Sequence, residues 1–191
     1  NVQVAVDTVN HLIVTHEVTN IGSDRAQLAN VAREAKAVLQ VDQLEAVADR
    51  GYFNGEEILA CEQAGICVTL PKPMTSGAKS EGRFGKQDFI YVPEEDVYRC
   101  PAGEKLKFHY ANEEHGQKMR RYWTNACKTC AIKDQCTTAK ERRITRWEHE
   151  HVLETVQQRL DQDPQAMRRR RETVEHPFGT LKMRMGATHF L

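Results

Sequence analysis

Apolar and polar residues alternate in two short stretches at the start of the chain, residues 2–7 and residues 11–18. Alternation of this kind predicts strands that each have one buried face. Only Thr8, Val9 and Asn10 separate the two stretches, so we expect an antiparallel hairpin.

Helical and strand-like patterns then alternate up to residue 70. Asp24 and Gln27 resemble a capping box, and the apolar stripe that follows predicts a helix over residues 24–39. A strand over residues 44–48, a helix over residues 54–64 and a strand over residues 66–70 complete the pattern. Because strands joined through a helix run parallel, the order β-β-α-β-α-β predicts a mixed α/β sheet.

The chain changes character after residue 70. Residues 71–85 are rich in Pro, Gly, Ser and Lys and are expected to form a mobile loop. Short strand-like pieces follow up to residue 147, together with four of the six cysteines. Helical periodicity returns over residues 148–160, and Asp163 and Pro164 are expected to start a last helix.

The formal net charge is zero, with 27 basic and 27 acidic side chains, but the two signs are unevenly distributed. Residues 1–70 contain 4 basic and 10 acidic side chains, whereas residues 100–147 contain 11 and 5. This suits a protein that meets a polyanion with one face and binds cations with another, although an ordinary solvated surface explains the same charges. No apolar run reaches the roughly 20 residues of a membrane span and no secretory leader is evident, so a cytoplasmic chain without membrane contact is expected.

Asp49 directly follows the predicted strand over residues 44–48, and Gly51 allows the chain to turn away. Ligands of open α/β sheets bind at the carboxyl ends of the strands, where a carboxylate can bind a hard divalent cation. A turn-forming Asp that accepts a hydrogen bond from its own backbone explains the same position.

Arg171, Glu175 and Lys182 are separated by four and seven residues, so on a helix they project from nearly the same side. An Arg and a Lys on either side of a carboxylate suit a place where phosphate and a metal ion meet. A ladder of salt bridges along a solvated helix is the alternative. Pro177 is expected to kink this helix just after Glu175.

Three stretches together resemble, in this order, the core of bacterial insertion-sequence DDE transposases: N-V-Q-V-A-V-D, V-A-D-R-G-Y-F-N and R-R-R-R-E-T-V-E-H-P-F-G-T-L-K. The last stretch is similar to the group with a Tyr-Arg-Glu-Lys signature, although Arg168 stands where that signature has Tyr. The resemblance implies a ribonuclease H-like α/β fold, a mixed sheet with flanking helices. Residues 1–86 would begin this core without its first strand, a small basic Cys-containing insertion over residues 87–147 would interrupt it, and residues 148–191 would complete it.

The resemblance also implies site residues, a cofactor and partners. Asp49 would be the second metal-binding Asp and Glu175 the metal-binding Glu, with Mg²⁺ or Mn²⁺ as the cofactor. Arg171 and Lys182 would contact DNA phosphate near the cut, with Arg168 in the place of the aromatic contact to the DNA end. The implied reaction is phosphodiester hydrolysis and strand transfer on double-stranded DNA, at insertion-sequence ends and target, by a protein that is a homo-oligomer when intact.

The first catalytic Asp of such transposases lies on a strand before the hairpin, whereas Asp7 falls at the hairpin turn. The chain is therefore expected to be a fragment of a catalytic domain that does not cleave or join DNA alone. Two alternatives remain open. One is a zinc-stabilised nucleic-acid-binding module in which Asp49 and Glu175 are structural, and the other is an inactive remnant of a transposase.

Four cysteines in the predicted insertion have the spacing C-x26-C-x2-C-x5-C: Cys100, Cys127, Cys130 and Cys136. Four thiolates can close a tetrahedral zinc site, and a C-x2-C pair commonly supplies two of the ligands. The x5 spacing differs from the second C-x2-C of a zinc ribbon, so four reduced structural thiols are an equal alternative. The transposases that this chain resembles carry a similar cysteine pattern between the second Asp and the Glu.

Basic and aromatic side chains are interleaved around these cysteines. The set consists of Lys105, Lys107, Lys118, Arg120, Arg121, Lys128, Lys133, Arg142, Arg143 and Arg146 with Phe108, Tyr110, Tyr122, Trp123 and Trp147. Such a mixture suits neutralisation of a nucleic-acid backbone and stacking on unpaired bases. A solvated face above buried rings explains the same residues equally well.

Overall fold

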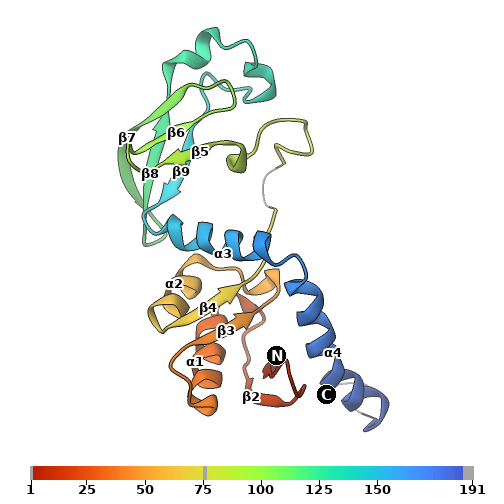
Figure 1. Ribbon diagram of the computed structural model, residues 1–191. Coiled ribbons are helices and arrows are strands. Elements are labelled where there is room, and N and C mark those ends of the chain that lie inside the picture. The colour runs from red at the N-terminus through yellow and green to blue at the C-terminus, as the bar shows by residue number, and fades with distance from the viewer. Residues whose placement is uncertain (1, 75–76, 187–191) are drawn as a thin grey trace. The chain divides into compact units, whose positions relative to one another are not determined.

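The computed structural model describes residues 2–74 and 77–186, without the side chains of residues 181 and 182 (Figure 1). The chain divides into two compact units, unit 1 from Asn1–Pro73 and His151–Leu191 and unit 2 from Met74–Glu150. The segment expected as an insertion, residues 87–147, lies within unit 2. The chain thus leaves unit 1 after residue 73 and returns to it at residue 151.

Unit 1 contains two pairs of strands. β1 (Val2–Val6) and β2 (Ile13–Val18) form the expected antiparallel hairpin, and β3 (Leu44–Val47) and β4 (Ile66–Thr69) pair in parallel. Within the described part of unit 1 the pairs are two separate sheets rather than the single mixed sheet that the sequence predicted.

Side-chain hydrogen bonds take the place of a shared backbone ladder between these two sheets. Gln3 in β1 is only 2% exposed. Its Nε2 donates to Asp24 Oδ1 over 2.7 Å, and its Oε1 accepts from the Tyr52 hydroxyl. Both partners lie in short 3₁₀ turns, η1 (Asp24–Ala26) and η2 (Arg50–Tyr52). The hairpin thus meets the rest of unit 1 through these side chains and through residues 28–39, and among the described residues its strands do not pair with the other sheet.

Helices cover the parallel pair, with α1 (Leu28–Leu39) and α2 (Gly55–Gln63) beside it in Figure 1. Asn54 caps α2 as predicted, since its side chain accepts from the backbone N–H of Glu56 over 3.0 Å. The helix predicted from residue 24 begins at Leu28 instead. Asp24 belongs to η1, which Ser23 caps. The carboxylate of Asp24 contacts Gln3.

The returning chain supplies α3 (Glu150–Gln162) and α4 (Ala166–Met183), and α4 continues through Pro177. The core of unit 1 forms where α3 meets α2 and β4, and it buries Ile58, Ile66, Val68, Leu70, Val152 and Val156 at 1% exposure or less. Each such aliphatic side chain contributes roughly 1.5–3 kcal/mol through its burial. This core fixes β3, and with it the position of Asp49.

Unit 2 is a curled antiparallel sheet of five strands in sequential order (Figure 1). The strands are β5 (Ile90–Val92), β6 (Val97–Arg99), β7 (Lys105–Glu114), β8 (Gln117–Trp123) and β9 (Ile144–Trp147). The sequence predicted strand-like pieces corresponding to β5, β6 and the start of β7, but not β8 or β9. Short 3₁₀ turns accompany the sheet, η3 (Lys86–Asp88), η4 (Asn125–Thr129) and η5 (Lys133–Gln135).

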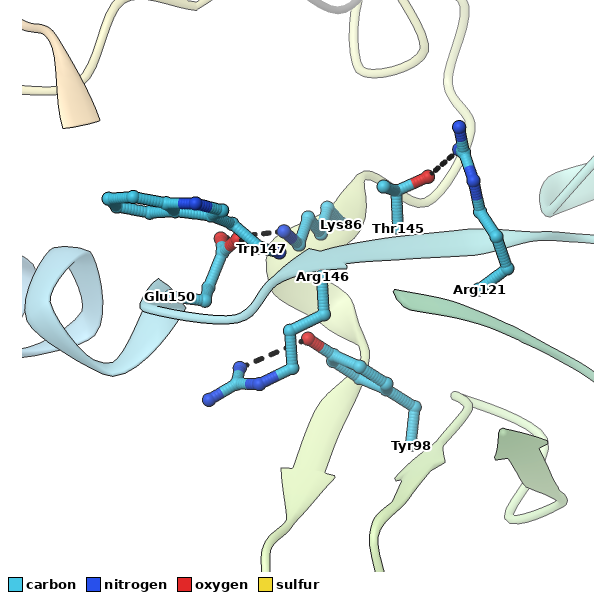
Figure 2. Close-up of polar contacts among 7 residues, drawn as sticks. All are labelled: Lys86, Tyr98, Arg121, Thr145, Arg146, Trp147 and Glu150. Atoms are coloured by element: carbon cyan, nitrogen blue, oxygen red, sulfur yellow. Dashed lines mark hydrogen bonds and ion pairs between the residues drawn. The ribbon is translucent and has the colours of Figure 1, made fainter. Parts of the chain in front are cut away.

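Glu150, the first residue of α3 and the last of unit 2, contacts two residues of unit 2, as Figure 2 shows. Its Oε2 accepts from the backbone N–H of Trp147 over 3.1 Å, and its Oε1 pairs with Lys86 Nζ at 2.6 Å. The neighbouring Arg146, only 7% exposed, donates to the Tyr98 hydroxyl over 3.2 Å. A carboxylate at the first turn of a helix is also favoured by the helix dipole.

Candidate active site at the end of strand β3

Asp49 lies just beyond β3 and takes part in two interactions through different oxygens. Its Oδ1 accepts from the backbone N–H of Gly51 over 2.8 Å, which makes it the cap of η2. Its Oδ2 accepts from a guanidinium nitrogen of Arg170 in α4 over 3.0 Å. The side chain remains 41% exposed. Asp49 therefore does form the turn, through Oδ1, while its Oδ2 contacts α4.

A second carboxylate, which the sequence presented only as a helix cap, lies beside Asp49. A methyl group at Gly51 would come within 2.9 Å of Asp49 Oδ1 and 3.7 Å of Asp24 Oδ2, so both carboxylates border the same small volume. The pKa of the neighbouring Tyr52 is raised to about 12, first by burial and then by the charges of Asp24 and Asp49, against an opposing effect of Arg170. No spacing rule links Asp24 to Asp49, because the two residues meet only through the packing of η1 against η2.

The predicted phosphate and metal residues of α4 are not at this contact. Arg171 and Glu175 are exposed and have no hydrogen bond or ion pair among the described residues. At about 100° per residue they lie about 100° and 140° around the helix from Arg170. Thr173, on the packed side of α4, is only 5% exposed. The structure therefore brings α4 to Asp49, but through Arg170 and not through Glu175.

The remaining signature positions have different surroundings. Arg168 pairs with Glu172 one turn away over 2.9 Å, and both side chains are exposed. This is an intrahelical salt bridge, but between other residues than the ladder of Arg171, Glu175 and Lys182 that the sequence offered as an alternative. Lys182 belongs to α4, but its side chain lies outside the described part of the structure.

Beyond Glu175, α4 also contacts the β1–β2 hairpin. The rings of His176 and His11 have their centroids 5.2 Å apart. His11 is at the hairpin turn with a φ of 56°, and its Nδ1 is buried without a hydrogen-bond partner in the described structure. Asp7, at the same turn, accepts from the backbone N–H of Asn10 over 2.7 Å. It is thus a turn residue, as the sequence indicated.

Comparison with known proteins finds a family match for the C-terminal part of the chain. Residues 99–191 match a family model described as a transposase DDE domain. The predicted resemblance to DDE transposases is thereby confirmed, and a transposase-type function with DNA as the general partner follows. No curated protein and no solved structure matches the chain.

The transposase DDE match includes Glu175 and the cysteine segment, whereas Asp49 precedes it. Among the described residues, no three or more His, Cys, Asp or Glu side chains are arranged to hold a metal ion. Carboxylate oxygens are nonetheless the ligands that Mg²⁺ and Mn²⁺ prefer, and Asp49 and Asp24 offer them at one place. No described helix is both long and apolar enough to cross a membrane.

Much of the basic and aromatic set in the transposase DDE match serves the fold of unit 2. Tyr122 and Trp147 are buried at 0% and 5% exposure, and Arg146 at 7%. Ion pairs occupy Lys105 with Glu95, Arg120 with Asp96, Arg121 with Glu114, and Arg143 with Glu141. For these members, the interpretation as a solvated face above buried rings is correct.

Exposed rings on β7, beside the partly exposed Trp123 of β8, remain as the part of this set suited to nucleic acid. Phe108 and Tyr110 are 39% and 46% exposed. His109 stacks on Trp123 with 3.4 Å between ring centroids, and the Arg143 guanidinium lies 4.8 Å from the centre of the same Trp123 ring. Aromatic faces beside cations can stack on bases and neutralise phosphate.

Proposed function

We propose that this chain acts in DDE-type DNA transposition, by metal-dependent phosphodiester hydrolysis and strand transfer at the ends of an insertion sequence. The proposal includes a ribonuclease H-like core formed by residues 1–86 and 148–191. The observation that carries it is the 3.0 Å contact between Asp49 and Arg170, which brings a strand-end carboxylate to the helix of the transposase signature.

In this proposal Asp49 and Glu175 hold Mg²⁺ or Mn²⁺, and Asp24 is a nearby carboxylate that the sequence did not suggest. A bound ion of this kind activates the attacking oxygen and stabilises the leaving oxygen of the phosphodiester. Arg170 acts as the counter-ion of Asp49 in the metal-free chain, since the guanidinium and a divalent cation would compete for Asp49 Oδ2. Its displacement would also release α4 from β3.

The proposal requires α4 to move. Glu175 is about 140° around the helix from Arg170 and about 7.5 Å along it, so both side chains cannot face Asp49 at once. A turn of α4 that exchanges Arg170 for Glu175 would place Arg171 and Lys182 on the same side, where they would bind phosphate. Arg168, one turn before Glu172, would extend this basic edge along the DNA.

Metal binding and DNA nicking test this proposal. Free Mn²⁺ is measured by electron paramagnetic resonance, and nicking of supercoiled plasmid is measured in Mn²⁺ with a chain extended upstream along its gene. Asp49→Asn and Glu175→Gln should each weaken Mn²⁺ binding and abolish nicking, while Glu172→Gln, on the same helix, should change neither. Mn²⁺ binding that ignores both substitutions contradicts a shared ion.

A second function, DNA binding without catalysis, is favoured by the two bonds that already engage Asp49, one to Gly51 and one to Arg170. Both are structural and need no metal ion. Fluorescence anisotropy with a double-stranded oligonucleotide separates the two functions. An enzyme keeps its DNA affinity in Asp49→Asn and loses nicking, whereas a binding module keeps its affinity and shows no nicking in the unsubstituted protein either.

A further inference from the structure

Four cysteines from three separate segments of unit 2 meet around one cavity. They are Cys100 between β6 and β7, Cys127 in η4, Cys130 at its end, and Cys136 directly after η5. The cavity has a volume of about 20 Å³, which is room for roughly one water-sized species. A site for a single small ion therefore exists between segments that are up to 36 positions apart in the sequence.

The backbone turns tightly beside Cys100 and Cys136. The Gly103 N–H donates to the Cys100 carbonyl over 2.8 Å, and the Cys100 N–H donates to the Glu104 carbonyl over 2.9 Å. Gly103 has a φ of 85°, which other residues adopt rarely, so the chain reverses tightly after Cys100. On the other side, the Cys136 N–H donates to the Lys133 carbonyl over 2.9 Å. These turns bring single cysteines to the cavity that the C-x2-C pair Cys127 and Cys130 also lines.

All four cysteines line the same cavity. All four cysteines are free thiols. The reactivity or metal binding of a free cysteine, rather than its packing, usually decides whether it is kept.

Two cations at the cavity match the charge of a filled site. A zinc ion with four thiolates has a net charge of −2, and the cavity is also lined by Lys133 and Arg142. The Nε of Arg142 is buried without a hydrogen-bond partner in the described structure. A thiolate sulfur at the centre of the cavity would supply that acceptor, and second-layer donors of this kind orient metal ligands.

We propose that Cys100, Cys127, Cys130 and Cys136 bind one structural Zn²⁺ that holds η4 and η5 against the sheet of unit 2. Binding releases the four thiol protons, and the sulfurs close inward on the ion, because the described side chains are not yet arranged to hold one. The site is separate from the proposed catalytic carboxylates, which lie in unit 1.

The test measures zinc in the whole 191-residue chain by mass spectrometry after expression with zinc and extensive dialysis. One zinc per chain is expected in the unsubstituted protein and in the control Cys67→Ser, and none in Cys127→Ser/Cys130→Ser. Arg142→Gln, which keeps all four thiols, should weaken zinc binding by about 10–100-fold. Zinc retained in the double variant overturns the proposal.

A second measurement uses the unsubstituted protein, so it does not require any variant to fold. Co²⁺ added to the metal-free protein should give the intense absorption of a tetrahedral tetrathiolate site, and Zn²⁺ should abolish that absorption. Equal reactivity of the thiols toward a disulfide reagent with and without zinc, together with no Co²⁺ spectrum, likewise overturns the proposal.

Discussion

Replacing Asp49 by Asn or by Ala separates its two roles in the metal-free chain. The carbonyl oxygen of Asn can still accept from the Gly51 N–H, so Asp49→Asn loses only the charge facing Arg170. That ion pair is 3.0 Å long, but its side chains are 26% and 41% exposed, so solvent screening reduces its value to about 0.2–1 kcal/mol. Asp49→Ala also loses the cap of η2, which adds about 1 kcal/mol.

The expected destabilisation is therefore about 0.2–1 kcal/mol for Asp49→Asn and about 1–2 kcal/mol for Asp49→Ala. Urea unfolding measures both, with one probe for each unit. Both tryptophans, Trp123 and Trp147, lie in unit 2, so tryptophan fluorescence follows that unit. Most helical residues lie in unit 1, so far-ultraviolet circular dichroism mainly follows unit 1. Only the dichroism transition should shift.

A double-mutant cycle with Arg170→Gln then isolates the ion pair, and the coupling energy should again be about 0.2–1 kcal/mol. Equal destabilisation by Asp49→Asn and Asp49→Ala would contradict these two roles, because the cap would then depend on charge. A coupling energy to Arg170 of zero within error, with a dichroism transition that still shifts, would contradict them as well.

Three further predictions concern single residues. Spectroscopic titration, with Tyr52→Phe as the difference reference, should find that Tyr52 ionises near pH 12, and Asp24→Asn should move this pKa toward 10.0. The stability that Tyr52 contributes is complete below pH 10.0 and is lost as pH rises through about 12. Burial alone would raise the pKa of Asp96, but hydrogen bonds from Tyr122 and Tyr91 and the charge of Arg120 lower it. Asp96→Asn should therefore destabilise unit 2 at neutral pH, and the difference, followed by tryptophan fluorescence, should disappear as pH falls through the folded-state pKa below 3.8. Glu175→Gln should leave the free energy of unfolding within about 0.5 kcal/mol, since this exposed residue has no partner among the described residues, and a larger loss in urea unfolding would contradict that.

Local signals in the sequence were sufficient for most elements of unit 1. Alternation predicted β1 and β2, and the Asn54 cap predicted α2. The arrangement of the strands was not local in this way: the strands form two sheets, and Gln3 of the hairpin contacts Asp24 and Tyr52, which are 21 and 49 positions away in the sequence. The β7–β8 hairpin did have a local signal in the sequence, the dipeptide His115-Gly116. Both residues form the two-residue turn and have positive φ, at 52° and 78°, as such a turn requires.

The sequence could predict only the part of the candidate site that follows from one local rule, namely that a carboxylate at the carboxyl end of a strand suits a ligand site. That rule identified Asp49. It could not identify Asp24, 25 positions earlier, because the two carboxylates approach only after η1 and η2 pack together. The helical stripe of Arg171 and Glu175 was read correctly as one face of α4, but periodicity does not say which face a helix turns to its neighbour.

The run of four arginines in α4 shows how strongly that choice of face matters. Successive positions differ by about 100°, so neighbouring side chains of one type meet different surroundings. Arg168 pairs with Glu172, Arg169 with Asp163 and Arg170 with Asp49. Arg171 alone of the four has no partner among the described residues. Of the three paired arginines only Arg170 reaches another element, because Glu172 lies in α4 itself and Asp163 lies just before it. In the proposed function Arg171 is the arginine that contacts phosphate, since an unpaired guanidinium binds an anion without breaking an ion pair.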